Sequence, residues 1–442
     1  MTQGPAPRTL ITTLASADTS ILDLLPDLRA ALNGSGPALL LHGPNQPAAG
    51  VPGSERPLIG PADDPQDPTA VAVTTSGSGG AARTVLLPAS ALLASAAATH
   101  DRLGGAGHWL LALPAQHVAG LQVLVRSLIA GTRPVALDLT AGFSAEGFTE
   151  AALALRGARR YTALVPTQLT RLLSTPGEAG VRALEALRRF DAVLIGGAAT
   201  PLSLRERAAA AGIRVVTTYG MSETAGGCVY DGVPLDGVTV QIPPRDHAPL
   251  ALTTDPNVQD HDPSSPRDHA RLATPDSASG GRIWLGGPML ARGYLDAPGD
   301  PAFSVDPGGN RWFRTDDAGV LDNGQLRILG RLDSMIITGG VNVSPGSVEA
   351  VLHRLPEVAE AVVVGLPDPQ WGQRVAVALV LAPGARPPTL AQVRALVTAE
   401  VSGPAAPRQL TVLGALPLRG PGKPDRIAIE RALREQPPLE GI

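Results

Sequence analysis

The chain has 442 residues, of which 44% are apolar and 17% charged, and its formal net charge is -4. That apolar content can bury more than one core, so we expect about two or three folded units. The weakly acidic balance gives no basic field for a phosphate backbone, which argues against a nucleic-acid partner.

The chain carries one cysteine, Cys228, which excludes an intramolecular disulfide framework. A buried, inert thiol is favoured for it over an acyl-transferring nucleophile, because no motif supplies a partner base. The N-terminus lacks a basic segment followed by an apolar run, and stretches such as Val375–Leu381 are far shorter than the roughly 18 residues of a membrane span. We therefore expect a cytoplasmic protein with no membrane contact.

Short β-rich runs alternate with helical stretches between residues 69 and 220. They are Thr69–Thr74, Trp109–Leu113, Ala192–Ile195 and Arg214–Tyr219. This alternation predicts an α/β layered domain, in which ligands bind at the carboxyl ends of strands.

A polar segment, 243–281, is rich in Pro, Asp, Ser and His and is expected to be a flexible insertion. Its histidines match no tetrahedral metal signature and indicate a solvated loop (His247, His261 and His269). The helix and strand pattern restarts near Asp333. We therefore predict an N-terminal domain, 1–332, and a small α+β domain, 333–442.

Four motifs carry candidate chemistry. Thr74–Arg83 combines hydroxyl and glycine residues that can wrap phosphates, although a flexible turn is the simpler interpretation and no lysine makes it a P-loop. Tyr219–Thr224 offers a stacking ring, a hydroxyl and a carboxylate suited to Mg²⁺. Trp312–Asp317 ends in an aspartate that can accept hydrogen bonds from ribose, with an acidic turn as the alternative.

The fourth motif, Leu416–Arg426, contains Lys423, the one lysine among 36 basic residues. Where arginine fills the other cationic positions, a surviving lysine indicates a site that needs a compact ammonium, with chance survival as the alternative.

In order and spacing these motifs resemble the adenylate-forming superfamily of acyl-CoA synthetases, over residues 69–426. The resemblance implies an α/β N-terminal domain with a mobile C-terminal lid, the cofactors ATP and Mg²⁺, and coenzyme A as co-substrate. It implies that the phosphates are held by Thr75, Ser76, Gly77, Ser78, Gly80 and Arg83, and the rest of the nucleotide by Gly197, Tyr219, Gly220, Ser222, Asp317 and Arg331.

By the same resemblance Glu223 holds Mg²⁺, Lys423 is the adenylation lysine and Asp333 is the hinge of the C-terminal domain. The turn Gly339-Gly340 is expected beside the CoA channel. Departures from the family pattern are Gly79, Ala82 and Arg83 in the phosphate loop, Ser222 in place of threonine and Asp316 in place of glycine. The altered loop predicts weaker ATP binding rather than loss of activity.

The stretches Leu113–Gly131 and Val165–Leu173 are similar to the o-succinylbenzoate:CoA ligases of menaquinone synthesis. This implies His117 at the acyl pocket, whereas the superfamily resemblance implies that Gly196, Gly197 and Ala198 line the adenine and acyl pocket. Arg126 is a candidate for the second carboxylate, with a helix-surface arginine as the alternative. The alternative for His117 is a core histidine bonded to a backbone carbonyl.

Two competing hypotheses remain open. One is an acyl-CoA ligase or carrier-protein adenylation enzyme for another small acid. The other is a degenerate nucleotide-binding protein, against which the retained Glu223, Asp317 and Lys423 argue. The oligomeric state also stays open, with a homo-oligomer among the alternatives.

Overall fold

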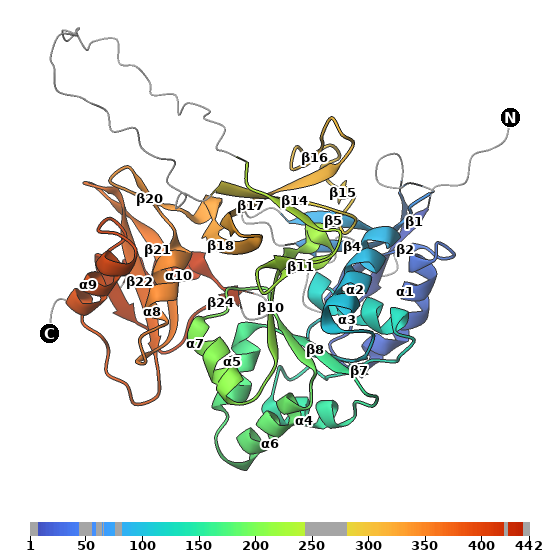
Figure 1. The fold of residues 1–442 in the computed structure, drawn as a ribbon, viewed down its shortest axis with the longest axis horizontal. Helices are drawn as coiled ribbons and strands as arrows, with labels where there is room; N and C mark the ends of the chain where they lie inside the picture. The colour runs from blue at the N-terminus through green and yellow to red at the C-terminus, as the bar shows by residue number, and fades with distance from the viewer. Residues whose placement is uncertain are drawn as a thin grey trace, which may run out of the picture.

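The computed structural model describes residues 8–43, 55–58, 64, 66–75, 82–243, 281–419 and 423–435. Figure 1 shows a large N-terminal part, coloured blue to yellow, and a smaller C-terminal part in orange and red. The predicted flexible insertion lies almost entirely outside the described residues, as do its three histidines. Among the described residues, no helix has the length and apolar character needed to span a bilayer.

The first sheet has six strands, and its central strands are buried along nearly their whole length. The first five residues of β4 are buried, which its run of small and β-branched residues allows because apolar layers cover both faces. Its order is β15 (Gly293–Tyr294), β5 (Arg83–Pro88), β4 (Thr69–Thr75), β2 (Ala38–His42), β1 (Thr9–Leu14) and β3 (Glu55–Pro57).

The second sheet has seven strands, and its order is β12 (Val233–Pro234), β11 (Gly226–Tyr230), β10 (Val215–Met221), β9 (Ala192–Ile195), β8 (Arg160–Leu164), β6 (His108–Leu111) and β7 (Val135–Ala136).

Between the two sheets lies an apolar layer that includes η1 (Thr19–Leu24), α1 (Leu25–Leu32), α2 (Ala89–Leu103) and α3 (Val118–Ile129). The other face is covered by α4 (Ala145–Leu153), α5 (Pro166–Ser174), α6 (Gly177–Arg188) and α7 (Leu202–Ala210). These layers confirm the predicted α/β architecture.

The third sheet consists of β13 (Thr239–Gln241), β14 (Gly281–Gly286), β17 (Arg311–Asp322), β16 (Phe303–Val305) and β18 (Gln325–Arg331). Strand β17 is twelve residues long, so Asp317 lies within a strand, and the alternative of an acidic turn is wrong. The β17 and β18 strands are antiparallel, and their register places Asp317 opposite Arg331.

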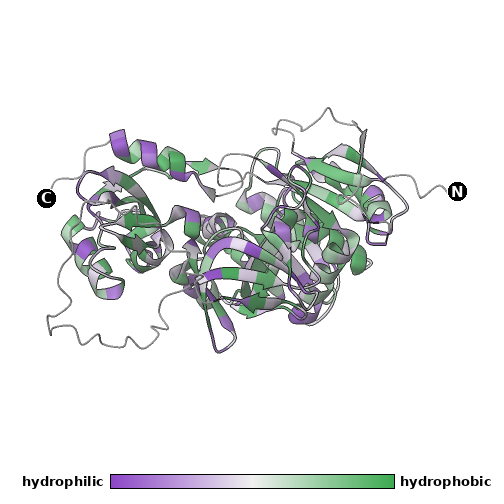
Figure 2. Cartoon of the chain, turned by 90° about the horizontal axis from the view of Figure 1, so that it is seen from above, coloured by the Kyte–Doolittle hydropathy of each residue, from purple (hydrophilic) through white to green (hydrophobic). Residues whose placement is uncertain are grey.

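Besides a two-stranded ladder near its end, the described C-terminal part combines a five-stranded sheet with three helices, which is an α+β arrangement. The sheet is formed by β20 (Val341–Val343), β19 (Ile336–Thr338), β22 (Gly372–Leu381), β21 (Val358–Asp368) and β23 (Gln409–Val412), and the helices are α8 (Pro345–Leu352), α9 (Leu390–Glu400) and α10 (Arg426–Glu435). Figure 2 shows apolar residues concentrated along the strands of this part.

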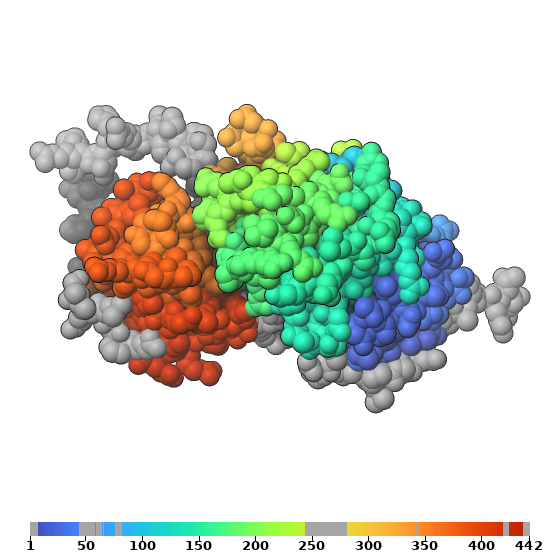
Figure 3. Space-filling model, turned by 90° about the horizontal axis from the view of Figure 1, so that it is seen from below, coloured from blue at the N-terminus to red at the C-terminus, as the bar shows by residue number. Residues whose placement is uncertain are grey.

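The two parts of the molecule lie against each other, as the space-filling view in Figure 3 shows. The hydroxyl of Ser344, the N-cap of α8, donates to the carbonyl of Leu329 in β18 and accepts from the amide of Ser347. The connection between the parts runs through the short 3-10 helix η4 (Leu332–Ser334). The start of α8 is thereby fixed to the third sheet beside that connection.

Candidate active site

Tyr219 and Asp317 meet where β10 of the second sheet approaches β17 of the third. The Tyr219 hydroxyl donates to Oδ2 of Asp317 at 2.8 Å. Burial raises the pKa of Tyr219 well above its ordinary value, and burial also raises the pKa of Asp317, against the opposing effects of Tyr219 and Arg331. The contact fixes the tyrosine ring and leaves Oδ1 of Asp317 on the side of Arg331.

Arg331 stands among three carboxylates. Its Nε and Nη2 donate to the two carboxylate oxygens of Asp333 at 2.9 and 2.8 Å. Its guanidinium also lies 3.6 Å from Asp316 and 3.9 Å from Asp317. The bidentate bond with Asp333 is the main cause that raises the pKa of Arg331. The predicted ribose-binding arginine and the predicted hinge aspartate are therefore in direct contact.

Asp316 is turned to a different side of this cluster. Its Oδ1 accepts from Nη1 of Arg282 at 2.9 Å, and its side chain is 57% exposed, against 13% for Asp317. The difference in exposure supports Asp317 rather than Asp316 as the carboxylate that faces a bound nucleotide.

Glu223 lies in η3 (Ser222–Thr224), which directly follows β10. The Tyr294 hydroxyl donates to Oε1 of Glu223 at 2.9 Å, and the Ala291 amide donates to the Glu223 carbonyl at 2.8 Å. Burial raises the pKa of Glu223. Ser222 opens the same turn, and its carbonyl accepts from the amide of Ala225.

A magnesium ion fits the chemistry of this position. None of the ion pairs among the described residues involves Glu223, and these residues contain no cluster of three metal-ligating side chains. Mg²⁺ is commonly held by one or two carboxylates together with substrate phosphates, so a lone carboxylate beside a triphosphate is a suitable ligand.

The phosphate-loop motif joins two antiparallel strands. Thr75 ends β4 and pairs with Arg83, which begins β5, and the Thr75 hydroxyl donates to the Arg83 carbonyl at 3.3 Å. The Arg83 guanidinium lies 3.4 Å from Asp300 and 4.8 Å from the centroid of the Tyr294 ring. The loop residues between the two strands lie outside the described residues (Ser76, Gly77, Ser78, Gly79 and Gly80).

Close backbone contacts require glycine at two predicted site positions. A Cβ on Gly220 would stand 2.1 Å from the Gly226 carbonyl oxygen, and one on Gly196 would stand 2.3 Å from the Thr218 hydroxyl. Gly197 has a φ of +80°, and Ala198 follows it in an exposed position after β9. At the carboxyl ends of β9 and β10, the three glycines therefore leave the backbone without side chains.

His117 is the N-cap residue of α3, where its carbonyl accepts from the Leu121 amide at 3.0 Å. Its side chain is partly buried. The residue therefore lies at the start of α3. The next turn of this helix contacts the segment between η3 and β11, because Gln122 donates to the Ala225 carbonyl at 2.7 Å.

Arg126 is 3% exposed, so the alternative of a helix-surface arginine is wrong. Its guanidinium lies 5.0 Å from the Trp109 ring centroid and 3.4 Å from the Tyr230 hydroxyl, and burial lowers its pKa. The structure does not bring it to Glu223 or Asp317 in any described contact. No described contact tests its predicted role with the second carboxylate, and the acid pocket that we propose is built without it.

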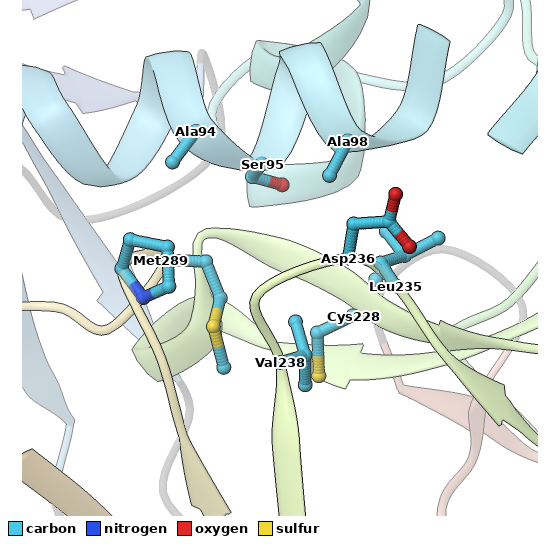
Figure 4. A pocket seen from close by; sticks show the side chains of 10 residues that line it. Ala94, Ser95, Ala98, Cys228, Leu235, Asp236, Val238 and Met289 are labelled. Atoms are coloured by element: carbon cyan, nitrogen blue, oxygen red, sulfur yellow. The ribbon is translucent and has the colours of Figure 1, made fainter. Parts of the chain in front are cut away.

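Cys228 is 1% exposed, and burial raises the pKa of its thiol to about 12. Figure 4 shows it in a small cavity with Val238 and Met289, facing Ser95 and Ala98 of α2. A thiol that stays protonated near neutral pH is a poor nucleophile, which agrees with the inert role that we expected.

Two predicted features lie in the C-terminal part. Lys423 begins the two-residue strand β25 (Lys423–Pro424), which pairs with β24 (Leu418–Arg419), so its backbone is in a short ladder rather than an irregular loop. Gly339 and Gly340 form the turn between β19 and β20 with φ of +56° and +77°, a conformation that favours glycine.

Tyr294 is a site residue that sequence reasoning missed. It stands in β15, which pairs with β5, and both Glu223 and Arg83 contact its side chain. No local sequence pattern indicates a functional role for Tyr294, because its two-residue segment Gly293–Tyr294 is typical of a short strand. Its place depends on a strand pairing between residues more than two hundred positions apart.

Comparisons with known proteins agree with this arrangement. The AMP-binding enzyme family matches residues 7–295, and the AMP-binding enzyme C-terminal domain matches residues 347–423. A relative from Mycobacterium tuberculosis, named "Probable 2-succinylbenzoate--CoA ligase", is 45% identical over 92% of this chain and 94% of its own length. A 2-succinylbenzoate--CoA ligase from Geobacillus sp. is 30% identical over 74% of this chain and 60% of its own length.

Solved structures share the fold. The o-succinylbenzoate CoA synthetase of Bacillus subtilis, in complex with its acyl-adenylate intermediate, has a TM-score of 0.66 and 22% identity, covering 99% of this chain and 90% of that one. An amide bond synthetase from Marinactinospora thermotolerans has a TM-score of 0.65 and 26% identity, covering 96% and 79%. The fold has a large N-terminal and a small C-terminal domain, and the chain belongs to the family of AMP-binding enzymes.

Proposed function

We propose that the protein ligates o-succinylbenzoate to coenzyme A with ATP, through an acyl-adenylate, in menaquinone synthesis. The observation that carries this proposal is the 45% identity to the M. tuberculosis relative over 92% of the chain. The contacts of Tyr219 with Asp317 and of Glu223 with Tyr294 support it, because they hold in fixed positions the side chains that we assign to the nucleotide and to Mg²⁺. The enzyme class is acid-thiol ligase.

In this proposal the nucleotide lies between the second and third sheets. The Tyr219 ring stacks on adenine, and Asp317 and Arg331 bind the ribose hydroxyls. Ser222 donates to the α-phosphate, and the loop from Thr75 to Arg83 holds the β- and γ-phosphates. Glu223 would hold Mg²⁺ together with the phosphates, and the ion would neutralise part of the triphosphate charge.

The first half-reaction forms a bond between a carboxylate oxygen of the acid and the α-phosphorus, and it breaks the bond to pyrophosphate. The ammonium of Lys423 offsets the negative charge that gathers between the two reactants. In the second half-reaction the CoA thiolate attacks the acyl carbon, and AMP leaves with the bonding electrons. Between them, the C-terminal domain, residues 333–442, turns about Asp333 and brings Gly339 and Gly340 to the CoA channel.

The acid lies beside the carboxyl ends of β9 and β10. His117 at the start of α3 and the backbone of Gly196 and Ala198 line its pocket. Arg126 is not carried into this pocket, because Trp109 and Tyr230 enclose its guanidinium.

The test is a reaction of purified protein with ATP, Mg²⁺, CoA and o-succinylbenzoate, followed by mass spectrometry of AMP and thioester. Thioester that depends on each component is expected. Formation of AMP without thioester would favour a carrier-protein acceptor, and activity with a different acid in a panel would overturn the substrate. No product with any acid would favour the degenerate alternative.

A further inference from the structure

Tyr294 lies between two side chains predicted to bind magnesium and the phosphates of ATP, Glu223 and Arg83. Its side chain is 4% exposed, and β15 pairs with β5 so that Tyr294 stands opposite Val85. The edge of its ring packs against Phe303, with the ring centroids 5.4 Å apart. The ring is thus fixed by strand pairing and by an aromatic contact before any ligand binds.

The hydroxyl of Tyr294 restricts the carboxylate of Glu223. The terminal torsion of a glutamate is broad, so an unbonded carboxylate samples many orientations. The 2.9 Å bond from Tyr294 occupies Oε1, and the 2.8 Å bond from the Ala291 amide holds the Glu223 backbone. Both contacts come from the segment 291–294. Together they hold the Glu223 carboxylate in an orientation that leaves Oε2 for a cation.

The ring of Tyr294 also restricts Arg83. The guanidinium carbon lies 4.8 Å from the ring centroid, and Asp300 holds the same group from another side at 3.4 Å. The Arg83 side chain is 49% exposed, so these contacts confine a group that is otherwise open to solvent. A cation over an aromatic face is attracted to it and is held at a defined distance.

We propose that Tyr294 is a positioning residue that sets the metal-binding carboxylate of Glu223 and the phosphate-binding guanidinium of Arg83 in one geometry for magnesium-bound ATP. This inference rests on the proposed function, since it needs Glu223 to face the metal. A tyrosine that served only packing would need the ring alone, whereas this role needs the hydroxyl.

The experiment measures binding of α,β-methylene-ATP by calorimetry, in excess Mg²⁺ and again in EDTA. The variants are Tyr294→Phe, Glu223→Gln and the double variant. Tyr161→Phe is the matched control, because its buried hydroxyl donates to the Leu103 and Gly105 carbonyls away from Glu223. Steady-state kinetics of thioester formation accompany the binding data.

Tyr294→Phe is expected to weaken binding about tenfold in Mg²⁺ and less than about twofold in EDTA, as for the loss of one hydrogen bond to a charged group. The KM for ATP rises while the KM for the acid does not. In the Glu223→Gln background the same change adds nothing, because the partner carboxylate is gone. Tyr161→Phe lowers the melting temperature without changing either affinity.

Equal weakening in Mg²⁺ and in EDTA, additive losses in the double variant, or no loss at all would each overturn the role of Tyr294. A different pattern points to the underlying assignment. If the wild type binds the analogue equally with and without Mg²⁺ and Glu223→Gln changes nothing, Glu223 is not the metal ligand, and the proposal falls with that part of the proposed function.

Discussion

The hydroxyl of Tyr219 donates to Oδ2 of Asp317 across 2.8 Å, although 98 residues separate the two in the chain. The bond ties the end of β10 to the middle of β17, so the second and third sheets meet at a defined distance. The bond engages the hydroxyl of a ring that is itself partly buried against the core of the third sheet. The nucleotide site that we propose therefore depends on a contact between two sheets rather than on one motif.

Replacing Asp317 by Asn should weaken ATP binding about tenfold, because the charged acceptor of the ribose hydroxyls is lost while the bond from Tyr219 can persist. The measurement is calorimetric titration with ATP in the absence of the acid. Asp322→Asn is the control, since Asp322 is exposed at the far end of the same strand. Equal effects of the two variants would exclude Asp317 from the ribose site.

Replacing Lys423 by Ala should slow adenylate formation about a hundredfold or more, the usual effect of removing a group that stabilises transition-state charge. Thioester formation from supplied acyl-adenylate should change little. Single-turnover assays of each half-reaction separate the two steps. A variant that loses both steps equally would show that Lys423 has a structural role.

Replacing Arg126 by Met should leave the KM for the acid within about twofold and should not lower the free energy of unfolding. None of the ion pairs among the described residues involves Arg126, so its burial carries a desolvation cost that an apolar chain of similar length avoids. Kinetics and urea unfolding are the measurements. A large rise in KM would assign Arg126 to the second carboxylate after all.

Replacing Gly220 by Ala should destabilise the protein by about 2 kcal/mol or more, because the new methyl group would stand 2.1 Å from the Gly226 carbonyl oxygen. The β10–β11 hairpin carries Tyr219 and Glu223, so activity should fall with stability. Gly403→Ala is the control, since no atom lies within 4 Å of its added Cβ. Urea unfolding of both variants tests the contrast.

His100 should make stability depend on pH. Burial, with a smaller effect of Arg126, lowers its pKa to about 4, and its Nε2 accepts from the Trp109 indole N–H. Between pH 6.5 and 4 the unfolded chain binds a proton that the folded protein does not, so the free energy of unfolding falls as pH decreases. The loss from this group between pH 7 and 5 is about 2 kcal/mol.

The measurement for His100 is urea unfolding at pH 7 and pH 5 for the wild type and His100→Gln. Glutamine keeps an acceptor for Trp109 but does not titrate, so the variant should lose less stability than the wild type over this interval. Identical pH dependence in both proteins would mean that His100 is not buried in the neutral form.

The sequence predicted the layers of the fold because strands such as Ala192–Ile195 are apolar throughout and bounded by polar turns. It predicted Glu223 and Asp317 because each stands in a compact motif. It missed Tyr294, whose contacts depend on long-range strand pairing. It also could not place Arg126, because periodicity identifies a helix but does not show which face of an apolar helix carries a buried cation.

The guanidinium of Arg331 contacts both the carboxylate that we assign to the ribose and the segment that connects the two parts of the molecule. Arg331 faces Asp317 across the β17–β18 ladder and binds Asp333 in the segment where we place the hinge. A ligand that draws Arg331 toward the ribose site changes the contacts of Asp333, and a turn at Asp333 changes what Arg331 offers to the ligand. If the proposed assignments of ribose site and hinge hold, thermodynamic linkage makes these effects reciprocal: nucleotide binding shifts the orientation of the C-terminal domain by the same free energy with which that orientation changes nucleotide affinity.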